Sequence, residues 1–218
     1  LRTNLINFER ADTYSNNFYV SEYELGAYMT DIVNVFRSYA SVKHIDLTYE
    51  SNFRYLNVWL DKDKMDSILK NIISNALKYT PEGGSVHVYA YETEDTWNVE
   101  VSDTGIGIPL DEQKKLFKMH FRGSNAINSK VTGSGIGLLL VWKLVHMHKG
   151  KLNFTSTEGK GSCIKVSFPK GEKRYRKAIH RPAPTKEQEQ NNEPEQITSP
   201  EKGTPDTPAV NTPIEGYE

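Results

Sequence analysis

Apolar residues recur along two stretches of the chain at the spacing of an amphipathic helix. Residues 24–42 and 63–79 place them three or four positions apart, which aligns them on one helical face. In the second stretch this face comprises Met65, Ile68, Leu69, Ile72, Ile73 and Ala76. Asp61 or Asp63 is suited to N-cap this helix, and Thr80-Pro81 ends it. A further helix is expected over about 135–148, and a short one near 111–118.

Shorter stretches alternate apolar and polar residues, which is typical of strands with one buried face. They are residues 45–49, 55–60, 85–91 and 97–102, and residues 17–25 also look extended. Residues 151–156 and 163–168 read as a final antiparallel pair joined by a glycine-containing turn. The order of these elements predicts an α/β fold with helices packed on one face of a mixed sheet.

Composition changes sharply near Lys170. Seven of the ten prolines lie beyond it, and from Pro182 on eight acidic residues face two lysines, a net charge of −6. A segment so poor in apolar residues cannot offset its ordering entropy, so residues 171–218 are predicted to be a disordered linker or tail. The basic cluster within 173–181 leaves open a patch that binds phosphates or acidic groups.

Whole-chain properties exclude several classes of function. The 218 residues carry a formal net charge of −1, which gives no global electrostatic case for nucleic-acid binding. The single cysteine, Cys163, rules out an intrachain disulfide and fits a reducing compartment. No run of about 18 apolar residues could span a membrane. Because the chain starts at Leu1, we interpret it as a piece of a longer protein.

The helix over 63–79 carries polar residues beside its apolar face. At about 100° per residue, Asn71, Asn75 and Lys78 form a neighbouring stripe. Asparagine disfavours helices, and such local penalties tend to mark functional sites. An amide oxygen suits Mg²⁺ and a lysine suits phosphate, although ordinary surface residues would give the same pattern.

Two glycine clusters follow. Residues 103–109, Asp-Thr-Gly-Ile-Gly-Ile-Pro, continue a predicted strand, so Asp103 could accept a hydrogen bond from an amine at the strand end. The same letters suit a plain turn, or an aspartic protease that would need a second copy from a homodimer. Residues 133–138, Gly-Ser-Gly-Ile-Gly-Leu, open a helix, where free N–H groups favour phosphates. They match neither a P-loop nor a dinucleotide fingerprint.

Together these motifs resemble the catalytic ATP-binding domain of sensor histidine kinases, in the group that includes DNA gyrase and the mismatch-repair ATPases. The resemblance covers about residues 1–170 and comprises an N box, a G1 box, an F box and a G2 box in order, at 70–80, 103–109, 116–123 and 133–138. It implies a Bergerat-type two-layer sandwich, with about three helices on one face of a mixed, mostly antiparallel five-stranded sheet. It also implies that residues 1–16 end an upstream dimerisation and phosphoacceptor helix, with the catalytic domain over 17–170.

The resemblance assigns roles around Mg²⁺-ATP. Asn75 would ligate the Mg²⁺ that bridges the phosphates, and Asn71 would support the same site. Lys78 and Tyr79 would contact phosphate and nucleotide, and Arg122 would reach the phosphates from a lid over 104–134.

Asp103 would accept a hydrogen bond from the adenine N6 amine. The remaining nucleotide-binding positions would shape the adenine pocket or let the lid and helix start wrap the phosphates. They are Gly105, Gly107, Ile108, Gly133, Gly135, Ile136, Gly137, Leu138 and Ser162.

The resemblance further implies a kinase of two-component signalling. Gyrase-like ATPases use a glutamate where this chain has Asn71, which cannot act as a general base. The implied activity is transfer of the ATP γ-phosphoryl group to a histidine outside this chain, in a cytoplasmic part of a membrane-bound, homodimeric sensor that addresses a receiver domain. Two departures, His120 in the F box and the missing acceptor motif, keep open a kinase-inactive nucleotide-binding regulator.

Overall fold

A computed structural model describes residues 17–116, 137–175 and 179–180. Its helices and strands follow the predicted order closely. Their bounds are β1 Tyr19–Glu24, α2 Leu25–Val42, β2 Asp46–Ser51, β3 Asn57–Leu60, α3 Lys62–Tyr79, β4 Ser85–Glu92, β5 Thr96–Asp103, α4 Leu110–Gln113, α6 Gly137–Met147, β6 Lys151–Thr157, β7 Gly161–Pro169, η1 Glu172–Tyr175 and β8 Ile179–His180.

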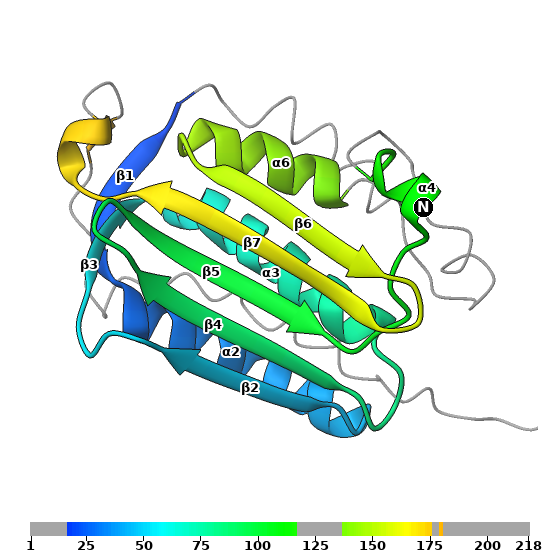
Figure 1. Ribbon diagram of the computed structural model, residues 1–218. Helices are drawn as coiled ribbons and strands as arrows, with labels where there is room; N and C mark the ends of the chain where they lie inside the picture. The colour runs from blue at the N-terminus through cyan, green and yellow to red at the C-terminus, as the bar shows by residue number, and fades with distance from the viewer. Residues whose placement is uncertain (1–16, 117–136, 176–178, 181–218) are drawn as a thin grey trace, which may run out of the picture. The chain divides into compact units, whose positions relative to one another are not determined.

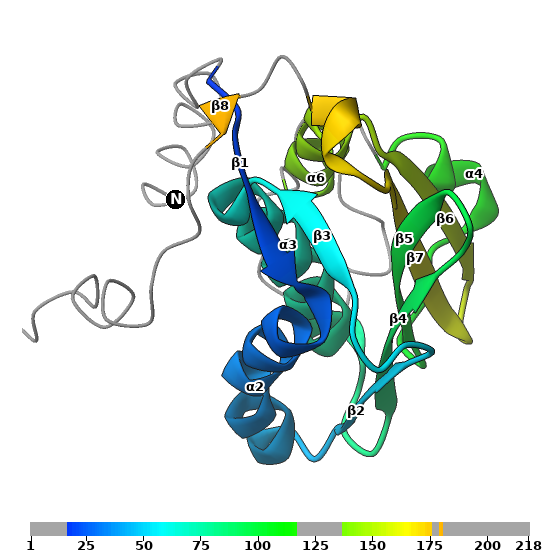
Figure 2. The same cartoon turned by 90° about the vertical axis from the view of Figure 1, so that its left-hand side faces the viewer.

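One five-stranded sheet forms a layer of the domain, in the order β2-β4-β5-β7-β6. Strands β2 and β4 run parallel, whereas the other neighbours are antiparallel. Helices α2, α3 and α6 lie against one face of this sheet (Figures 1 and 2). The predicted two-layer α/β sandwich with a mixed, mostly antiparallel sheet is therefore confirmed.

The core lies between these two layers. All six residues predicted on the inner face of α3 are buried. They meet side chains that alternate along the strands, among them Trp97 and Phe168, whose ring centroids lie 4.5 Å apart. The helical and strand periods in the sequence thus select the two surfaces that pack together.

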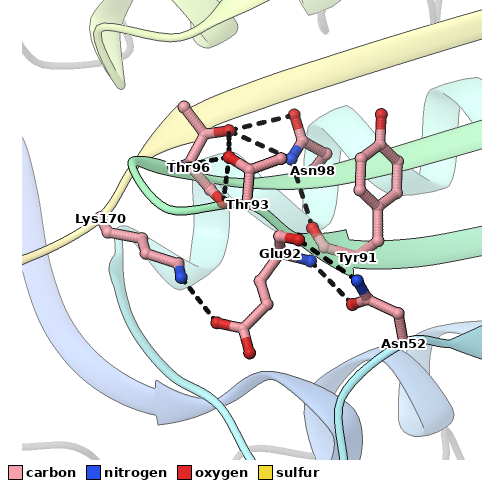
Figure 3. A network of polar contacts seen from close by, with 7 residues as sticks. All are labelled: Asn52, Tyr91, Glu92, Thr93, Thr96, Asn98 and Lys170. Carbon is pink, nitrogen blue, oxygen red and sulfur yellow. Dashed lines mark hydrogen bonds and ion pairs between the residues drawn. The ribbon is translucent and has the colours of Figure 1, made fainter.

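The end of the sheet at the β4–β5 turn is closed by a polar network (Figure 3). Asn52, which follows β2, exchanges two hydrogen bonds with the backbone of Glu92. The Glu92 carboxylate pairs with Lys170 at 2.6 Å, just after β7. Thr93 and Thr96 bond to each other across the turn. This network ties the ends of β2, β4, β5 and β7 together, at the end of β5 opposite Asp103.

Two elements continue past the predicted boundary at residue 170. The 3₁₀ helix η1 ends at Tyr175, whose side chain is buried and donates a hydrogen bond to the His148 carbonyl oxygen at 3.3 Å. Strand β8 pairs in parallel with β1, in a three-stranded sheet of order β3-β1-β8. Composition misses these elements because one buried aromatic anchors an otherwise polar segment. Within the described ranges, no helix is long and apolar enough to cross a bilayer.

Candidate functional site

Asp103 is the last residue of β5 and sits between two neighbouring strands. Its Oδ1 accepts hydrogen bonds from the backbone N–H of Gly105 at 2.8 Å and of Ser162, on β7, at 3.2 Å. Burial raises the pKa of this carboxyl group, and the two N–H groups act in the opposite direction. Within the described residues Oδ2 accepts no hydrogen bond, so one carboxylate oxygen is fixed and the other is an acceptor without a described donor.

Glycines after Asp103 let the loop pass close to other backbone. A Cβ at position 105 would lie 2.6 Å from the carbonyl oxygen of Tyr79, at the end of α3. Gly107 has a φ of +61°, and a Cβ there would clash with the carbonyl oxygen of Thr157. Side chains at 105 and 107 are thus excluded for a steric reason.

The two asparagines of α3 face the start of α6. A Cβ at Gly137 would lie 2.8 Å from Asn71 Oδ1 and 3.8 Å from Asn75 Nδ2. The Asn71 amide nitrogen donates to the Ser67 carbonyl oxygen at 2.7 Å, which turns its oxygen towards Gly137. The Asn75 side chain makes no hydrogen bond to any described residue. The fold therefore brings the predicted N box and the described part of the G2 box together.

The last turn of α3 connects the two asparagines to the loop that follows Asp103. The Tyr79 carbonyl oxygen accepts a hydrogen bond from the Ile106 N–H at 3.1 Å. The Lys78 ammonium group lies 5.0 Å from the centroid of the Tyr79 ring. Leu138 packs against the core at the start of α6. Helix α3 thus carries the two asparagines and also holds the loop that follows Asp103.

Two residues that the sequence analysis missed hold this loop from the β6 side. Ser156 Oγ accepts a hydrogen bond from the Ile108 N–H at 2.8 Å and lies 2.9 Å from Ser162 Oγ. Gln113 Nε2 donates to the carbonyl oxygens of Ile108 and Ser156, both at 2.9 Å. The two serines are cross-strand partners in β6 and β7. Counting outward from the predicted turn could have paired them, whereas nothing in the sequence marks Gln113.

Several predicted positions lie outside the described residues. They are Arg122, Gly133, Gly135 and Ile136, together with most of the lid and the F box. Residues 1–16, with their predicted upstream helix, and the segment from 181 to 218 are outside them as well.

The described arrangement can bind a ligand that has an amine at one end and an anion at the other. Asp103 Oδ2 is an acceptor for an amine. The start of α6 offers backbone N–H groups, and the asparagines supply neutral oxygen donors beside it. Among the described residues no group of three or more His, Cys, Asp or Glu could hold a metal ion.

Sequence comparison finds sensor kinases among the relatives of this chain. The sensor histidine kinase WalK of Bacillus subtilis is 33% identical over 171 residues, which cover 78% of this chain and 28% of WalK. The adaptive-response sensory kinase SasA of Thermosynechococcus vestitus is 40% identical over 113 residues, 51% of this chain and 29% of SasA. The chain therefore spans less than a third of the length of either relative.

Solved structures share the fold. The nucleotide-free catalytic domain of the histidine kinase ThkA superposes with a TM-score of 0.61 at 22% identity, covering 71% of this chain and 98% of that one. Full-length ShkA in complex with AMPPNP gives 0.62 at 21% identity over 70% of this chain and 31% of that one. Residues 60–172, more than half of the chain, match the model of the histidine kinase-, DNA gyrase B- and HSP90-like ATPases. The chain therefore belongs to this ATPase family.

Proposed function

We propose that this chain is the catalytic part of a sensor histidine kinase, which binds Mg²⁺-ATP and transfers the γ-phosphoryl group to a histidine outside residues 1–218. The observation that carries the proposal is the meeting of Asn71 and Asn75 with Gly137 at the start of α6. Phosphoryl transfer depends mostly on positioning and on neutralising the phosphate charge. A helix start beside two amide side chains supplies both.

On the phosphate side, Asn75 would ligate Mg²⁺ through its amide oxygen and Asn71 would support the same site. The residues fit the ion, because Mg²⁺ takes one or two protein oxygen ligands and completes its shell with phosphates and water. The Asn75 side chain makes no hydrogen bond to a described residue, which supports this role. Lys78 adds positive charge, and Arg122 from the lid is assigned to the phosphates as well.

On the adenine side, Asp103 Oδ2 accepts a hydrogen bond from the N6 amine. Gly105 and Gly107 keep the pocket wall at backbone thickness, with Ile108 and Ser162 beside them. Tyr79, the last residue of α3, is assigned to contact the nucleotide. The glycines assigned to wrapping the phosphates are Gly133, Gly135 and Gly137, with Ile136 and Leu138 between and after them.

Asn71 separates a kinase from a hydrolase. An amide cannot take a proton from water, so ATP bound here is kept for transfer rather than hydrolysed. We expect Asn71→Glu to raise ATP hydrolysis measured by phosphate release. Unchanged hydrolysis in a variant that still binds ATP would refute this role for Asn71.

The wider assignment rests on the relatives being sensor kinases. We assign the acceptor histidine to helices upstream of residue 17, in a homodimeric protein whose partner is a receiver domain. We assign residues 17–170 to the catalytic domain, with η1 and β8 added to its fold, and the part beyond β8 to a linker. The chain is placed on the cytoplasmic side of a membrane-bound sensor.

The test is phosphoryl transfer in trans. The chain is incubated with γ-labelled ATP, Mg²⁺ and an acceptor-helix fragment of the full-length protein, and the labelled product is tested for the acid lability of phosphohistidine. We expect label on the fragment, lost with Asn75→Ala or when the acceptor histidine is replaced. A chain that binds ATP but never labels the fragment would contradict the kinase assignment and leave a regulatory module.

A further inference from the structure

The turn that ends α2 is built to hold a lysine in one place. His44 has a φ of +52°, the left-handed conformation that follows many helix ends. The Ile45 N–H donates to the Ala40 carbonyl oxygen at 2.9 Å, and the His44 N–H donates to that of Ser41 at 3.0 Å. These two bonds define a Schellman motif, so the backbone of the preceding residue, Lys43, is fixed.

The Lys43 ammonium group reaches across to the end of α3. Its Nζ donates to the carbonyl oxygens of Leu77 at 2.8 Å, Lys78 at 3.3 Å and Thr80 at 3.1 Å. An ammonium group has three N–H donors, so all of them are used. The last carbonyl groups of a helix lack partners within it and carry its negative dipole end, which a cation stabilises.

The carbonyl groups between these positions have partners too. Thr80 donates to the Ala76 carbonyl oxygen through its N–H at 3.1 Å and through its hydroxyl at 2.7 Å. The Tyr79 carbonyl oxygen accepts from Ile106. Among the described contacts of this last turn, the Tyr79 carbonyl oxygen is the one bonded to the loop after Asp103, and Lys43 holds the carbonyl groups of Lys78 and Thr80 on either side of it.

We propose that Lys43 is a positioning residue of the nucleotide site. Its ammonium group bonds backbone carbonyl oxygens at the end of α3, among them that of Lys78, and it acts on the site through this backbone. It fixes the last turn of α3 so that the Tyr79 carbonyl oxygen meets the Ile106 N–H, which sets the loop that shapes the adenine side. The inference rests on the proposed function for its nucleotide part.

The experiment compares Lys43→Met with Lys62→Met. The second substitution also removes one positive charge near α3, but from a partly exposed pair at 3.8 Å with Asp66, which keeps Lys70 at 3.0 Å. Calorimetric titration with a non-hydrolysable ATP analogue and Mg²⁺ should give about tenfold weaker binding for Lys43→Met, as expected for losing hydrogen bonds from a charged donor. Lys62→Met should stay within about twofold of the unaltered protein. Lys43→Arg keeps the charge and should recover most of the loss.

A second readout needs no nucleotide. Amide hydrogen exchange of Ile106 in the free protein should speed up in Lys43→Met and not in Lys62→Met, while thermal unfolding shows that both are folded. If Lys43→Met does not fold, Lys43→Gln, which keeps an amide donor, takes its place.

The outcomes separate the two proposals. An unaltered protein that binds no nucleotide overturns the proposed function, and the nucleotide part of this inference with it. Normal binding by the unaltered protein, with equal affinity and equal Ile106 exchange in Lys43→Met and Lys62→Met, overturns the positioning role alone.

Discussion

Helices α3 and α6 pack side by side and touch through polar groups in two places, which differ in how far those groups are paired within the protein. At one end Asp61, the N-cap of α3, donates its N–H to His148 Nε2 at 3.3 Å, just after α6. At the other, Asn71 and Asn75 face Gly137 at the start of α6. The first contact, which we call the sealed end, is buried. At the second, which we call the open end, the Asn75 side chain makes no hydrogen bond to a described residue.

The sealed end satisfies its charges internally. Asp61 Oδ2 accepts from Lys64 Nζ at 3.0 Å and from the Tyr19 N–H at 2.9 Å. Lys64 Nζ also donates to the Asn17 carbonyl oxygen at 3.1 Å. Asp61, Lys64 and His148 are 3%, 4% and 0% exposed, so water does not compensate a lost partner. These bonds hold Asn17 and Tyr19, before and at the start of β1, against the beginning of α3.

The open end carries polar groups that we assign to nucleotide binding. The Asn75 amide and Asp103 Oδ2 have no hydrogen-bond partner among the described residues, and both asparagines disfavour the helix that carries them. Substitutions at the sealed end should therefore lower stability without changing affinity once the protein is folded. Substitutions at the open end should do the reverse.

Lys64→Met should have the largest effect, because it leaves the Asp61 carboxylate buried without its cation. We expect a loss of about 3–5 kcal/mol in the free energy of unfolding, measured with denaturant. Lys62→Met, at a partly exposed pair on the same helix whose Asp66 also has Lys70, should cost less than about 0.5 kcal/mol. Equal losses would show that the sealed end is no more than a surface ion pair.

Asn75→Ala, at the open end, should lower affinity for Mg²⁺-ATP without lowering stability. Removal of a Mg²⁺ ligand should weaken Mg²⁺-ATP binding roughly 100-fold, by calorimetric titration. Stability should rise by about 0.5 kcal/mol because alanine is the better helix former. Asn34→Ala, on an exposed face of α2, should leave affinity unchanged. A clear loss of stability in Asn75→Ala would give Asn75 a structural role.

His148 makes the sealed end sensitive to acid. Burial lowers the pKa of its imidazole from 6.5 to about 4. Between these values the unfolded chain binds a proton that the folded chain does not, so stability falls as the pH falls. The loss attributable to His148 is about 2–3 kcal/mol between pH 7 and 4.5.

The check is the difference between unfolding free energies at pH 7 and 4.5. It should shrink by that amount in His148→Gln, which does not titrate, and stay unchanged in His146→Gln, at an exposed position two residues earlier. A difference that His148→Gln leaves intact would assign the acid sensitivity to other groups.

His44→Gly should give the smallest effect. A non-glycine residue in the left-handed region is strained, so glycine should add about 0.5–1 kcal/mol to stability. His44→Ala removes the same side chain but keeps the Cβ, and should bring no gain. If both variants gain equally, the exposed imidazole rather than the backbone conformation is the source.

The sequence predicted much of this arrangement because period and motif are local properties. The apolar period of α3 identified its buried face, and the same period placed Asn71 and Asn75 on a neighbouring stripe. The contacts that the sequence could not reveal join residues far apart in the chain, such as Lys43 with the end of α3. Neither can alternation alone show that β2 and β4 pair in parallel, because pairing partners are set by the whole sheet.

The most direct test of the account is calorimetric titration of the chain with a non-hydrolysable ATP analogue, with and without Mg²⁺, beside Asp103→Ala. The account predicts Mg²⁺-dependent binding that the substitution abolishes, since it removes the carboxylate oxygen that we assign to the adenine amine. Absence of binding by the unaltered chain, or binding that Asp103→Ala leaves intact, would contradict it.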